Sequence, residues 1–340
     1  MKTLKLALAG AWHVHTRIFM PMVKKALGEA VDWVSVYDRD AVRGKEAAKL
    51  LSCPFVSSYQ EILDNPEIDL IVIEAETCDH KEMILQAAKA GKNVFCEKIL
   101  AITTDDALEI KRAIEESGIK FGVSHEALTV APYMYTKKLL DEGVFGDFVS
   151  MHFRRAHGMA KKTLNDEWFS RKIAGGGDLI DLGIHGASML AFLGGKPKRV
   201  SAFTHNFTGH ETEDSATILV EFENGGIGTA HTDMVTSIME NNFELVGTDG
   251  MITVTGTDRS NVTSLQSTHI PSTGSEMCVI PAEQYSNDCL TPIVHFIREV
   301  MLSDSGRRSV PGLDIDTAVT VVRLVEAAYE SAATGTSVAF

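Results

Sequence analysis

The first 122 residues alternate short apolar runs with longer segments of helical periodicity. This alternation restricts the fold more than any other feature, because strands separated by helices form right-handed β-α-β units and a parallel sheet. We therefore predict a doubly wound α/β domain over residues 1–122. Its strand candidates are Leu4–Ala9, Trp33–Tyr37, Leu70–Ile73, Val94–Cys96 and Lys120–Val123, and its helix candidates are His15–Leu27, Ala41–Leu51, His80–Ala90 and Thr104–Ser117.

The rhythm changes from about residue 147, where strand-like segments follow one another through turns such as Glu223–Gly226 and Thr248–Gly250. Residues 123–340 are therefore expected to form an α+β domain with an open, mainly antiparallel sheet. The segment 256–286, rich in Ser, Thr and Pro, is expected to be a loop or a weakly ordered edge. The strand candidates are Phe148–Arg155, Arg199–Asn206, Ala216–Phe222, Ile227–Asp233, Asn242–Val246 and Met251–Thr255, with helical patterns at 130–142, 178–193, 288–303 and 314–333.

Charge and composition exclude several classes of partner. The net charge of −14 argues against binding through nucleic-acid phosphates, which requires a basic surface. No stretch reaches about 18 uninterrupted apolar residues, so no membrane span is expected. Residues Met1–Lys5 lack the apolar core of a signal peptide, and five scattered cysteines without a CxxC pair are typical of reduced thiols. These features predict a cytoplasmic protein.

The first strand ends in Gly10-Ala11-Trp12-His13-Val14-His15, where a dinucleotide-binding chain has GxGxxG. Gly10 fills the first position, but Trp12 replaces the glycine that lets backbone amides approach the pyrophosphate, so this fingerprint alone is weak. Asp38 ends the second strand, 28 residues after Gly10, where a ribose-binding carboxylate belongs. It favours NAD over NADP, although Arg39 can pair with a phosphate instead. The other interpretation of residues 38–40 is a solvated loop that caps the next helix.

A second motif begins with the triple glycine at 175–177 and runs through an apolar segment. In it Asp181 and His185 are four residues apart, so on a helix both project from one face. An acidic group and an imidazole on one buried face suit proton transfer. The alternative is a glycine hinge followed by a core helix with a satisfied histidine.

The segment Ala90–Lys98, AGKNVFCEK, resembles the AGKHVxxEKP signature of the glucose–fructose oxidoreductase/inositol dehydrogenase/MocA (Gfo/Idh/MocA) family, with Ile99 where that family usually has Pro. His80, Pro132 and the run from the triple glycine to His185 match the family in the same order over essentially the whole chain. The resemblance implies a Rossmann domain followed by an open-sheet domain, with the nicotinamide between them. It also implies homodimers or homotetramers formed through the open sheet.

The resemblance further implies that Lys98 hydrogen-bonds the reacting hydroxyl, that His185 removes its proton and that Asp181 orients or helps to bind the substrate. These residue types suit the oxidation of an alcohol, which needs a base near neutral pH and a cation beside the developing alkoxide. Ser188 stands where the family has an acid. The expected cofactor-binding residues are Gly10, Trp12, His13, Val14, Asp38, Arg39, Ala75, His80, Glu97 and Lys98, and the expected substrate-binding residues are Lys98, His125, Arg155, His157, Trp168, Asp181 and His185.

Several of these residues have a plainer interpretation. Lys98 can be an exposed lysine at a strand end, and the polar residues from Arg155 to Trp168 can form a solvated loop with ordinary salt pairs. His13 and His15 suggest a metal site with His80 or Glu76, but no recognisable ligand spacing accompanies them, so no metal is expected.

The expected function is an NAD(H)-dependent oxidoreductase that interconverts a secondary hydroxyl and a ketone on a sugar, a sugar derivative or inositol. One alternative is an NAD-assisted enzyme that cleaves glycosides by transient oxidation at C3 and elimination. Another is a non-catalytic sensor of NAD or sugar, for which Trp12 is the best support. The open sheet also offers an oligomer surface, and Ile218, Val220 and Phe222 alternate as a strand with one buried face requires.

Overall fold

The computed structural model describes residues 3–161, 165–237, 240–257, 260–270, 273, 276–285 and 291–340. The chain divides into two compact units, the first formed by Met1–His125 with Leu290–Val322 and the second by Glu126–Cys289 with Arg323–Phe340. The expected boundary at residue 122 lies close to the observed one. The expectation that 123–340 forms one domain needs correction, because the chain returns to the first unit before it ends.

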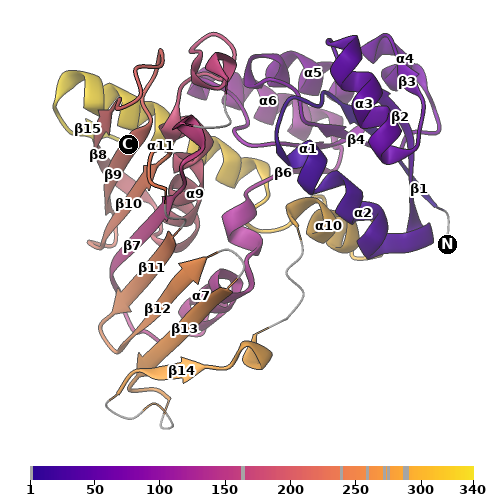
Figure 1. Cartoon of the computed structure of the whole chain (residues 1–340). Helices are drawn as coiled ribbons and strands as arrows, with labels where there is room; N and C mark the ends of the chain where they lie inside the picture. Colours follow the sequence, from indigo (N-terminus) through magenta and orange to yellow (C-terminus); the bar gives the residue numbers. More distant parts are fainter. Residues whose placement is uncertain are drawn as a thin grey trace. The chain divides into compact units, whose positions relative to one another are not determined.

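A six-stranded sheet, in which every strand pair is parallel, forms the first unit in the order β3-β2-β1-β4-β5-β6. The chain starts at the middle of this sheet, proceeds to one edge and then crosses to the other, with helices on both faces (Figure 1), so the doubly wound α/β fold is confirmed. Its elements are β1 (Leu4–Ala9), α1 (His15–Ile18), α2 (Met20–Leu27), η1 (Gly28–Ala30), β2 (Val31–Tyr37), α3 (Ala41–Leu51), β3 (Phe55–Val56), α4 (Tyr59–Asp64), β4 (Leu70–Ile73), α5 (Thr77–Lys89), β5 (Asn93–Cys96), α6 (Thr104–Ser117) and β6 (Phe121–Val123).

Capping chemistry explains where several of these helices begin and end. The side chain of Asp40 accepts hydrogen bonds from the amides of Val42 and Arg43 at the start of α3, and Thr103 does the same for α6. The predicted helix His15–Leu27 is divided at Phe19, because Pro21 lies in the first turn of α2 and has no amide hydrogen to continue the earlier helix.

A segment from near the C-terminus completes the core of the first unit. It contains α10 (Pro292–Phe296), a π-helical turn η7 (Ile297–Met301) and the start of α11 (Ile315–Thr334). The ring of Phe296 lies 5.5 Å from that of Phe95 on β5, and Ile293 and Ile297 are fully buried in the same cluster. This packing is the physical reason for the corrected boundary, since an apolar helical pattern does not reveal which sheet the helix covers.

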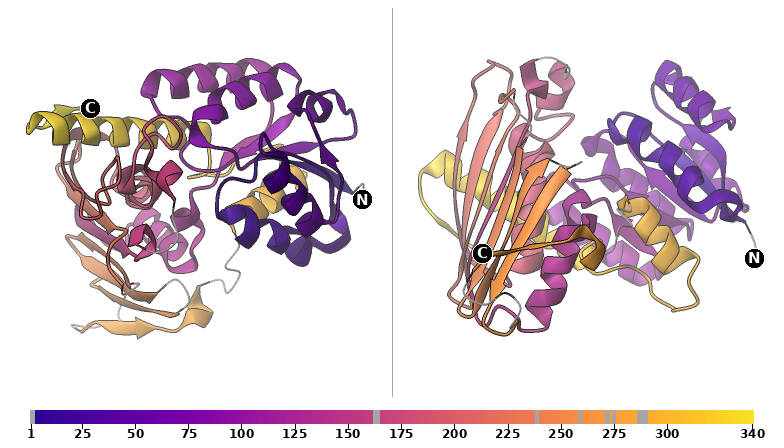
Figure 2. Two further views of the ribbon diagram at one scale, coloured as in Figure 1. Left: turned by 45° about the horizontal axis from the view of Figure 1, so that its top comes forward. Right: turned by 60° about the horizontal axis from the view of Figure 1, so that its bottom comes forward.

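One open sheet of nine strands dominates the second unit, in the order β14-β13-β12-β11-β7-β10-β9-β8-β15 (Figure 2). Only the pair β7–β10 is parallel among the described strands, so the prediction of a mainly antiparallel sheet is confirmed. The elements are η2 (Glu126–Thr129), α7 (Ala131–Asp141), β7 (Phe148–Ala156), η3 (Met159–Lys161), η4 (Asp166–Phe169), α8 (Asp178–Asp181), α9 (Gly183–Leu193), β8 (Pro197–His205), β9 (Ser215–Phe222), β10 (Ile227–Asp233), β11 (Glu240–Gly247), β12 (Gly250–Thr257), β13 (Ser260–Ser267), β14 (Cys278–Ile280), η6 (Ala282–Gln284) and β15 (Val338–Ala339).

The segment 256–286 is not the loop that its composition predicts. Strand β13 pairs with β12 along its whole length, and β14 adds an edge strand to it. Thr263 and Leu265 are buried on one side of β13, so its small polar residues still supply an inward face. A composition rich in Ser and Thr therefore did not indicate that this segment contains a strand.

The two faces of the nine-stranded sheet differ. Helix α9 packs on β7, β9 and β10, and Ile218, Val220 and Phe222 of β9 are buried on the same face of the sheet. These alternating positions therefore pack within one chain. The opposite face carries apolar side chains that remain exposed, namely Phe203, Leu219, Ile227, Val262 and Val279.

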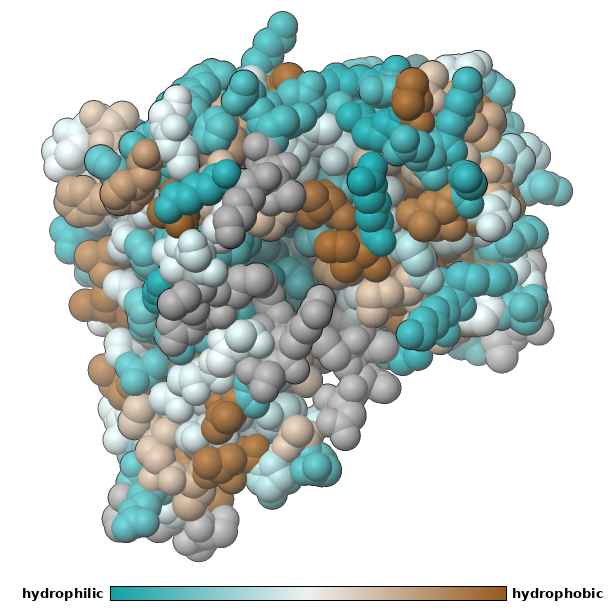
Figure 3. Space-filling view, in the orientation of Figure 1, coloured by the Kyte–Doolittle hydropathy of each residue, from teal (hydrophilic) through white to brown (hydrophobic). Residues whose placement is uncertain are grey.

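On the side of the first unit that Figure 3 shows, hydrophilic side chains predominate, with hydrophobic ones scattered between them. Among the residues that the structure describes, none of the helices combines the length and the apolar character that crossing a bilayer requires.

Candidate active site

The loop after β1 makes the tight turn that a dinucleotide site requires. Gly10 has φ of +83°, and a Cβ atom there would lie 2.4 Å from Cα of Ala75, so no other residue fits without displacement of β4. The amides of Trp12 and His13 donate to the carbonyl oxygen of Glu74 at 3.0 and 3.2 Å. The loop is thus fixed to the end of β4, and its first glycine fits the expected cofactor.

Asp38 organises this region rather than pointing into open space. Its Oδ2 accepts hydrogen bonds from the amide of Ala11 (2.7 Å) and from Nε of Arg43 (2.8 Å). Its Oδ1 accepts from the amide of Asp40 and from Nη2 of Arg43, both at 2.7 Å. A ribose hydroxyl would therefore have to replace one of these four donors. No motif in the sequence marks Arg43 as part of this region.

Two arginines form ion pairs with Asp38 and with the carboxylates beside it. Nη2 of Arg43 also lies 2.9 Å from Glu76, and Arg39 lies 2.9 Å from both Glu76 and Asp79. Burial by itself lowers the pKa of Arg43, but the hydrogen bond to Asp38 and the charge of Glu76 raise it above its usual value. Arg39 is the more exposed of the two and keeps part of its guanidinium accessible.

An open pocket of about 740 Å³ lies at the carboxyl ends of β1, β2 and β4, where ligands bind in doubly wound sheets. Three of the expected cofactor residues, Gly10, Arg39 and Ala75, are among its walls. Aromatic and apolar side chains supply a flat surface beside charged groups, as an adenosine moiety requires. The lining residues are Gly10, Tyr37, Arg39, Tyr59, Ala75, Glu76, Asp79, Glu82, Met83 and Gln86.

The turn that carries Lys98 follows β5, and the side chain of His80 contacts its backbone. The ring nitrogens of His80 lie 2.8 Å from the carbonyl oxygen of Ile99 and 3.1 Å from that of Ala75, and a neutral imidazole donates to only one of them at a time. Burial lowers the pKa of His80. The Lys98–Ile99 peptide bond is cis. Lys98 is only 6% exposed, so it is not the exposed strand-end lysine of the plainer interpretation.

Four further buried groups meet next to Lys98. Nδ1 of His15 lies 3.0 Å from Oε1 of Glu97, and Nδ1 of His13 lies 3.7 Å from the same oxygen. Burial and the charge of Glu97 raise the pKa of Glu74 well above its usual value. Burial also favours a raised pKa at Glu97, but His15 and His13 outweigh it and lower the pKa of Glu97 to about 2. His80 and Glu76, the partners considered for His13 and His15 in the sequence, are engaged elsewhere.

In the second unit, the triple glycine lets the start of α8 approach β9 closely. A Cβ atom on Gly177 would lie 1.9 Å from the carbonyl oxygen of Glu213. Oε1 of Glu213 accepts hydrogen bonds from the amides of Gly177 and Leu179, both at 3.1 Å, and from the hydroxyl of Tyr329 at 2.7 Å. Glu213 therefore anchors the helix that carries Asp181, and nothing in the sequence marks it.

Asp178 lies on the first turn of α8 and is fully buried. The hydroxyl of Thr232 donates to its Oδ2 at 2.6 Å. Burial raises the pKa of Asp178 well above its usual value, and the nearby carboxylates of Glu213, Asp181 and Asp233 raise it further. These effects favour the neutral form of Asp178, which lies three residues before the half-buried Asp181.

His185 lies on α9, after a single residue, Leu182, that separates α8 from α9 and keeps helical backbone angles. Nε2 of His185 lies 3.8 Å from Oε2 of Glu126, and the same oxygen accepts a hydrogen bond from Nη1 of Arg155 at 3.1 Å. The hydroxyl of Ser188 donates a hydrogen bond to the backbone carbonyl oxygen of His185. The acid that the family has at this position is thus replaced by a group that bonds within the helix.

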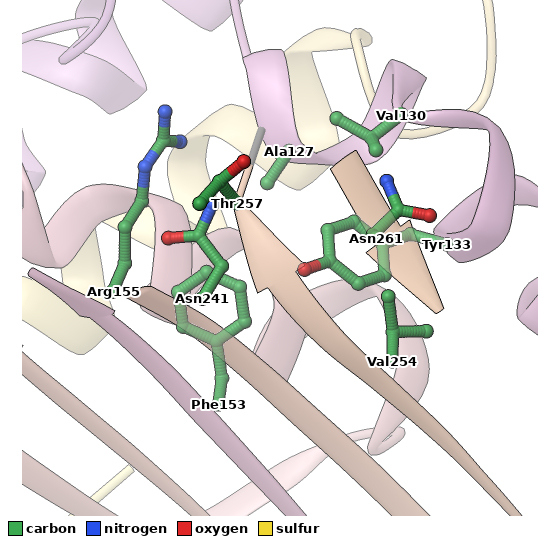
Figure 4. A pocket seen from close by; sticks show the side chains of 9 residues that line it. All are labelled: Ala127, Val130, Tyr133, Phe153, Arg155, Asn241, Val254, Thr257 and Asn261. Carbon is green, nitrogen blue, oxygen red and sulfur yellow. The ribbon is translucent and has the colours of Figure 1, made fainter. Parts of the chain in front are cut away.

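Arg155 also lines a narrow pocket in the second unit (Figure 4). Figure 4 shows Arg155, Asn241 and Thr257 near one another and the ring of Tyr133 close to Asn261. The lining residues are Ala127, Val130, Tyr133, Phe153, Arg155, Asn241, Val254, Thr257 and Asn261.

Three expected substrate residues lie elsewhere in the chain. Nδ1 of His125 lies 2.8 Å from the carbonyl oxygen of Gly312 inside the first unit, and burial lowers its pKa. Trp168 is 8% exposed, so most of its ring is packed in the second unit. The amide of Met159 donates to Nδ1 of His157 at 3.4 Å. The expected role of Trp168 in substrate binding stays a prediction.

Residues 5–125 match the family model described as an oxidoreductase family with an NAD-binding Rossmann fold, and residues 133–253 match the GFO/IDH/MocA C-terminal domain. A 1,5-anhydro-D-fructose reductase from Ensifer adhaerens is 32% identical over 201 residues, which cover 58% of this chain and 60% of that protein. A 2,7-anhydro-N-acetylneuraminate hydratase from Escherichia coli (strain K12) is 29% identical over 225 residues, 64% of this chain and 59% of that protein. The matched region thus spans about three fifths of each of these relatives.

The crystal structure of an NAD binding oxidoreductase from Klebsiella pneumoniae superposes with a TM-score of 0.84 at 20% identity, covering 99% of both chains, and shows the same fold. The two family models cover the Rossmann half and most of the open-sheet half in the expected order. The match to an NAD-binding domain also confirms the expected cofactor class. The chain belongs to the Gfo/Idh/MocA family of oxidoreductases.

Proposed function

We propose that this protein interconverts a secondary hydroxyl and a ketone on a sugar, a sugar derivative or inositol, with NAD(H) as its cofactor. The observation that carries this proposal is the buried His185 beside the partly buried pair of Glu126 and Arg155 in the second unit, together with the buried Lys98 in the first. NAD supplies the acceptor for the hydride. The chain supplies a base, a cation and the groups that hold both in place.

Each group has a defined task. The ammonium of Lys98 donates a hydrogen bond to the reacting oxygen and stabilises its developing negative charge. His185 accepts the hydroxyl proton, and the carboxylate of Glu126, 3.8 Å from Nε2, stabilises the imidazolium that results. Asp181 binds or orients the substrate from the preceding helix. Arg155 holds Glu126 through the hydrogen bond from its Nη1.

The test is a pair of variants, Lys98→Ala and His185→Ala, with Lys89→Ala and His269→Ala as matched controls on exposed positions. Both site variants are expected to lose turnover by a factor of roughly 100 or more, since a positioned acid or base contributes about that much. Calorimetry should show NAD affinity within a few-fold of the parent protein. The substrate screen uses NAD⁺ reduction across inositols, hexoses, uronates and aryl glycosides. Unchanged turnover in both site variants contradicts the proposal.

Cofactor preference is proposed to favour NAD. Three carboxylates, Asp38, Glu76 and Asp79, surround two arginines at the end of β2, so the cluster has a net negative charge. A 2′-phosphate would add about two further negative charges to this cluster. We expect a lower KM for NAD than for NADP, measured with the same substrate.

A second candidate function comes from the hydratase relative. In this candidate function, transient oxidation of the substrate next to the reacting carbon would permit elimination. The NADH so formed would be oxidised back to NAD⁺ before the product leaves. Such an enzyme forms no net NADH. Mass spectrometry of the products, with NADH absorbance followed in parallel, separates this reaction from a net oxidation.

The exposed apolar face of the nine-stranded sheet is proposed to bind a second copy of the chain. Phe203 is 79% exposed and Ile227 is 49% exposed on this face. Burial of these apolar side chains against a second chain would lower the free energy of the sheet. Light scattering after gel filtration should report a dimer or tetramer, and Phe203→Asp should shift it toward the monomer. A cytoplasmic location is proposed on the free thiols of Cys53, Cys78, Cys96 and Cys278, and cell fractionation tests it.

A further inference from the structure

Three metal-ligating side chains meet in the first unit, at the carboxyl ends of two strands. His13 and His15 follow β1, and Glu97 follows β5. Within the part of the chain that the structure describes, they form a group in which one ligand atom from each residue lies within 4.8 Å of the other two. All three are buried, with exposed fractions of 4%, 9% and 1%.

The two distances from Glu97 to the histidines suit a transition-metal ion. Nitrogen and oxygen ligands at about 2.1 Å from a tetrahedral ion lie roughly 3.4 Å from one another. The distances from Oε1 of Glu97 to Nδ1 of His15 and of His13 are 3.0 and 3.7 Å, on either side of that value. The amide of His15 also donates to Nδ1 of His13 at 3.2 Å, a long hydrogen bond that coordination would replace.

A second observation points to a ligand at this place. Oε2 of Glu97 and Oε1 of Glu74 are buried and have no hydrogen-bond partner among the described residues. An unsatisfied buried carboxylate oxygen is costly, so a donor or a cation is needed there. Glu74 itself is fully buried, and its backbone carbonyl accepts from the amide of His13, which ties this second carboxylate to the same loop.

We propose that His13, His15 and Glu97 bind a divalent transition-metal ion of the zinc class. Two imidazoles and one carboxylate form a ligand set that zinc uses with a water in the fourth position, and that water would offer a partner to the unsatisfied buried carboxyl of Glu74. The ion adds positive charge to the loop in which Trp12 replaces the second glycine. The proposal concerns the first unit alone and does not depend on the substrate of the enzyme.

The test uses untagged, full-length protein, dialysed against chelator and titrated with zinc chloride alone. Calorimetry and elemental mass spectrometry are expected to give about one tightly bound zinc per chain. His13→Ala and His15→Ala should each weaken binding by tenfold or more, whereas His269→Ala, at an exposed histidine, should leave it unchanged. Zinc should also raise the Tm of the parent protein and not that of the two site variants.

X-ray absorption on the zinc-loaded parent protein keeps the proposal falsifiable even where a variant fails to fold. The expected spectrum has imidazole scattering and first-shell distances of about 2.0–2.2 Å. A first shell without imidazole overturns the proposal. So does the absence of saturable binding at one equivalent, or equal zinc affinity in the parent and in folded His13 and His15 variants.

Discussion

Replacement of Glu213 by alanine tests how the second unit holds its proton-transfer helix. Oε1 of Glu213 accepts three hydrogen bonds, from the amides of Gly177 and Leu179 at 3.1 Å and from the hydroxyl of Tyr329 at 2.7 Å. A hydrogen bond to a charged group contributes about 1.5–3 kcal/mol. At the lower limit the three together contribute about 4.5 kcal/mol, and water entering the vacated space reduces the loss to roughly 3–4 kcal/mol. That is a large part of the 5–15 kcal/mol typical of a folded domain.

Urea unfolding followed by circular dichroism measures this loss, with two graded controls. Tyr329→Phe removes one of the three donors and should cost about 1.5 kcal/mol. Glu213→Gln keeps a neutral acceptor and should cost less than Glu213→Ala. In a double-mutant cycle, Tyr329→Phe should cost at least about 1 kcal/mol less in the Glu213→Ala background than in the parent. The m-value should stay unchanged in all variants.

The same substitution should act on turnover through the position of Asp181 and His185. We expect Glu213→Ala to lower kcat well before it changes NAD affinity, because Glu213 lies in the second unit and the expected cofactor residues at Gly10 and Asp38 lie in the first. A stability loss below about 1 kcal/mol, with additive effects of the Glu213 and Tyr329 substitutions, would refute the anchoring role.

Three further predictions follow from buried groups. Gly10→Ala should abolish measurable NAD binding by calorimetry, because the residue has φ of +83° and its new Cβ atom would meet Ala75 at 2.4 Å. Asp178→Asn should become increasingly stabilising as pH rises from 4 to 8. Burial raises the folded-state pKa of Asp178, so the folded parent keeps a proton that the unfolded chain releases above about pH 4. The parent therefore loses stability as the pH rises through this window, and the Asn variant does not. Urea unfolding at several pH values measures the difference in stability, and a difference that does not change with pH contradicts the prediction. Arg43→Ala should weaken NAD binding about tenfold or more and lower the Tm, since Asp38 then keeps its buried charge without the guanidinium. Calorimetry measures the affinity and thermal melts measure the Tm. Unchanged values of both would refute the role of Arg43 in holding Asp38.

The sequence predicted the elements whose periodicity is local. The strands at 4–9, 70–73 and 227–233 lie where their apolar patterns placed them. Lys98 and His185 are buried, and their catalytic roles stay predictions. Contacts between residues distant in the sequence could not be predicted from local patterns. Arg43 and Glu213 carry no motif, since their roles arise only when a helix start or a second strand lies beside them.

The chain order of the first unit has a consequence for synthesis. Val123 ends its last strand, whereas Pro292 begins the helix that covers Phe95 with Phe296. About 170 residues separate the two, which a ribosome adds in roughly 10–35 seconds. During that interval Phe19, Met20 and Val23 cover part of the apolar cluster that contains Phe95, and the rest stays exposed and favours aggregation of the nascent chain. Exchange of this cofactor module between relatives must therefore transfer two separate stretches of the gene.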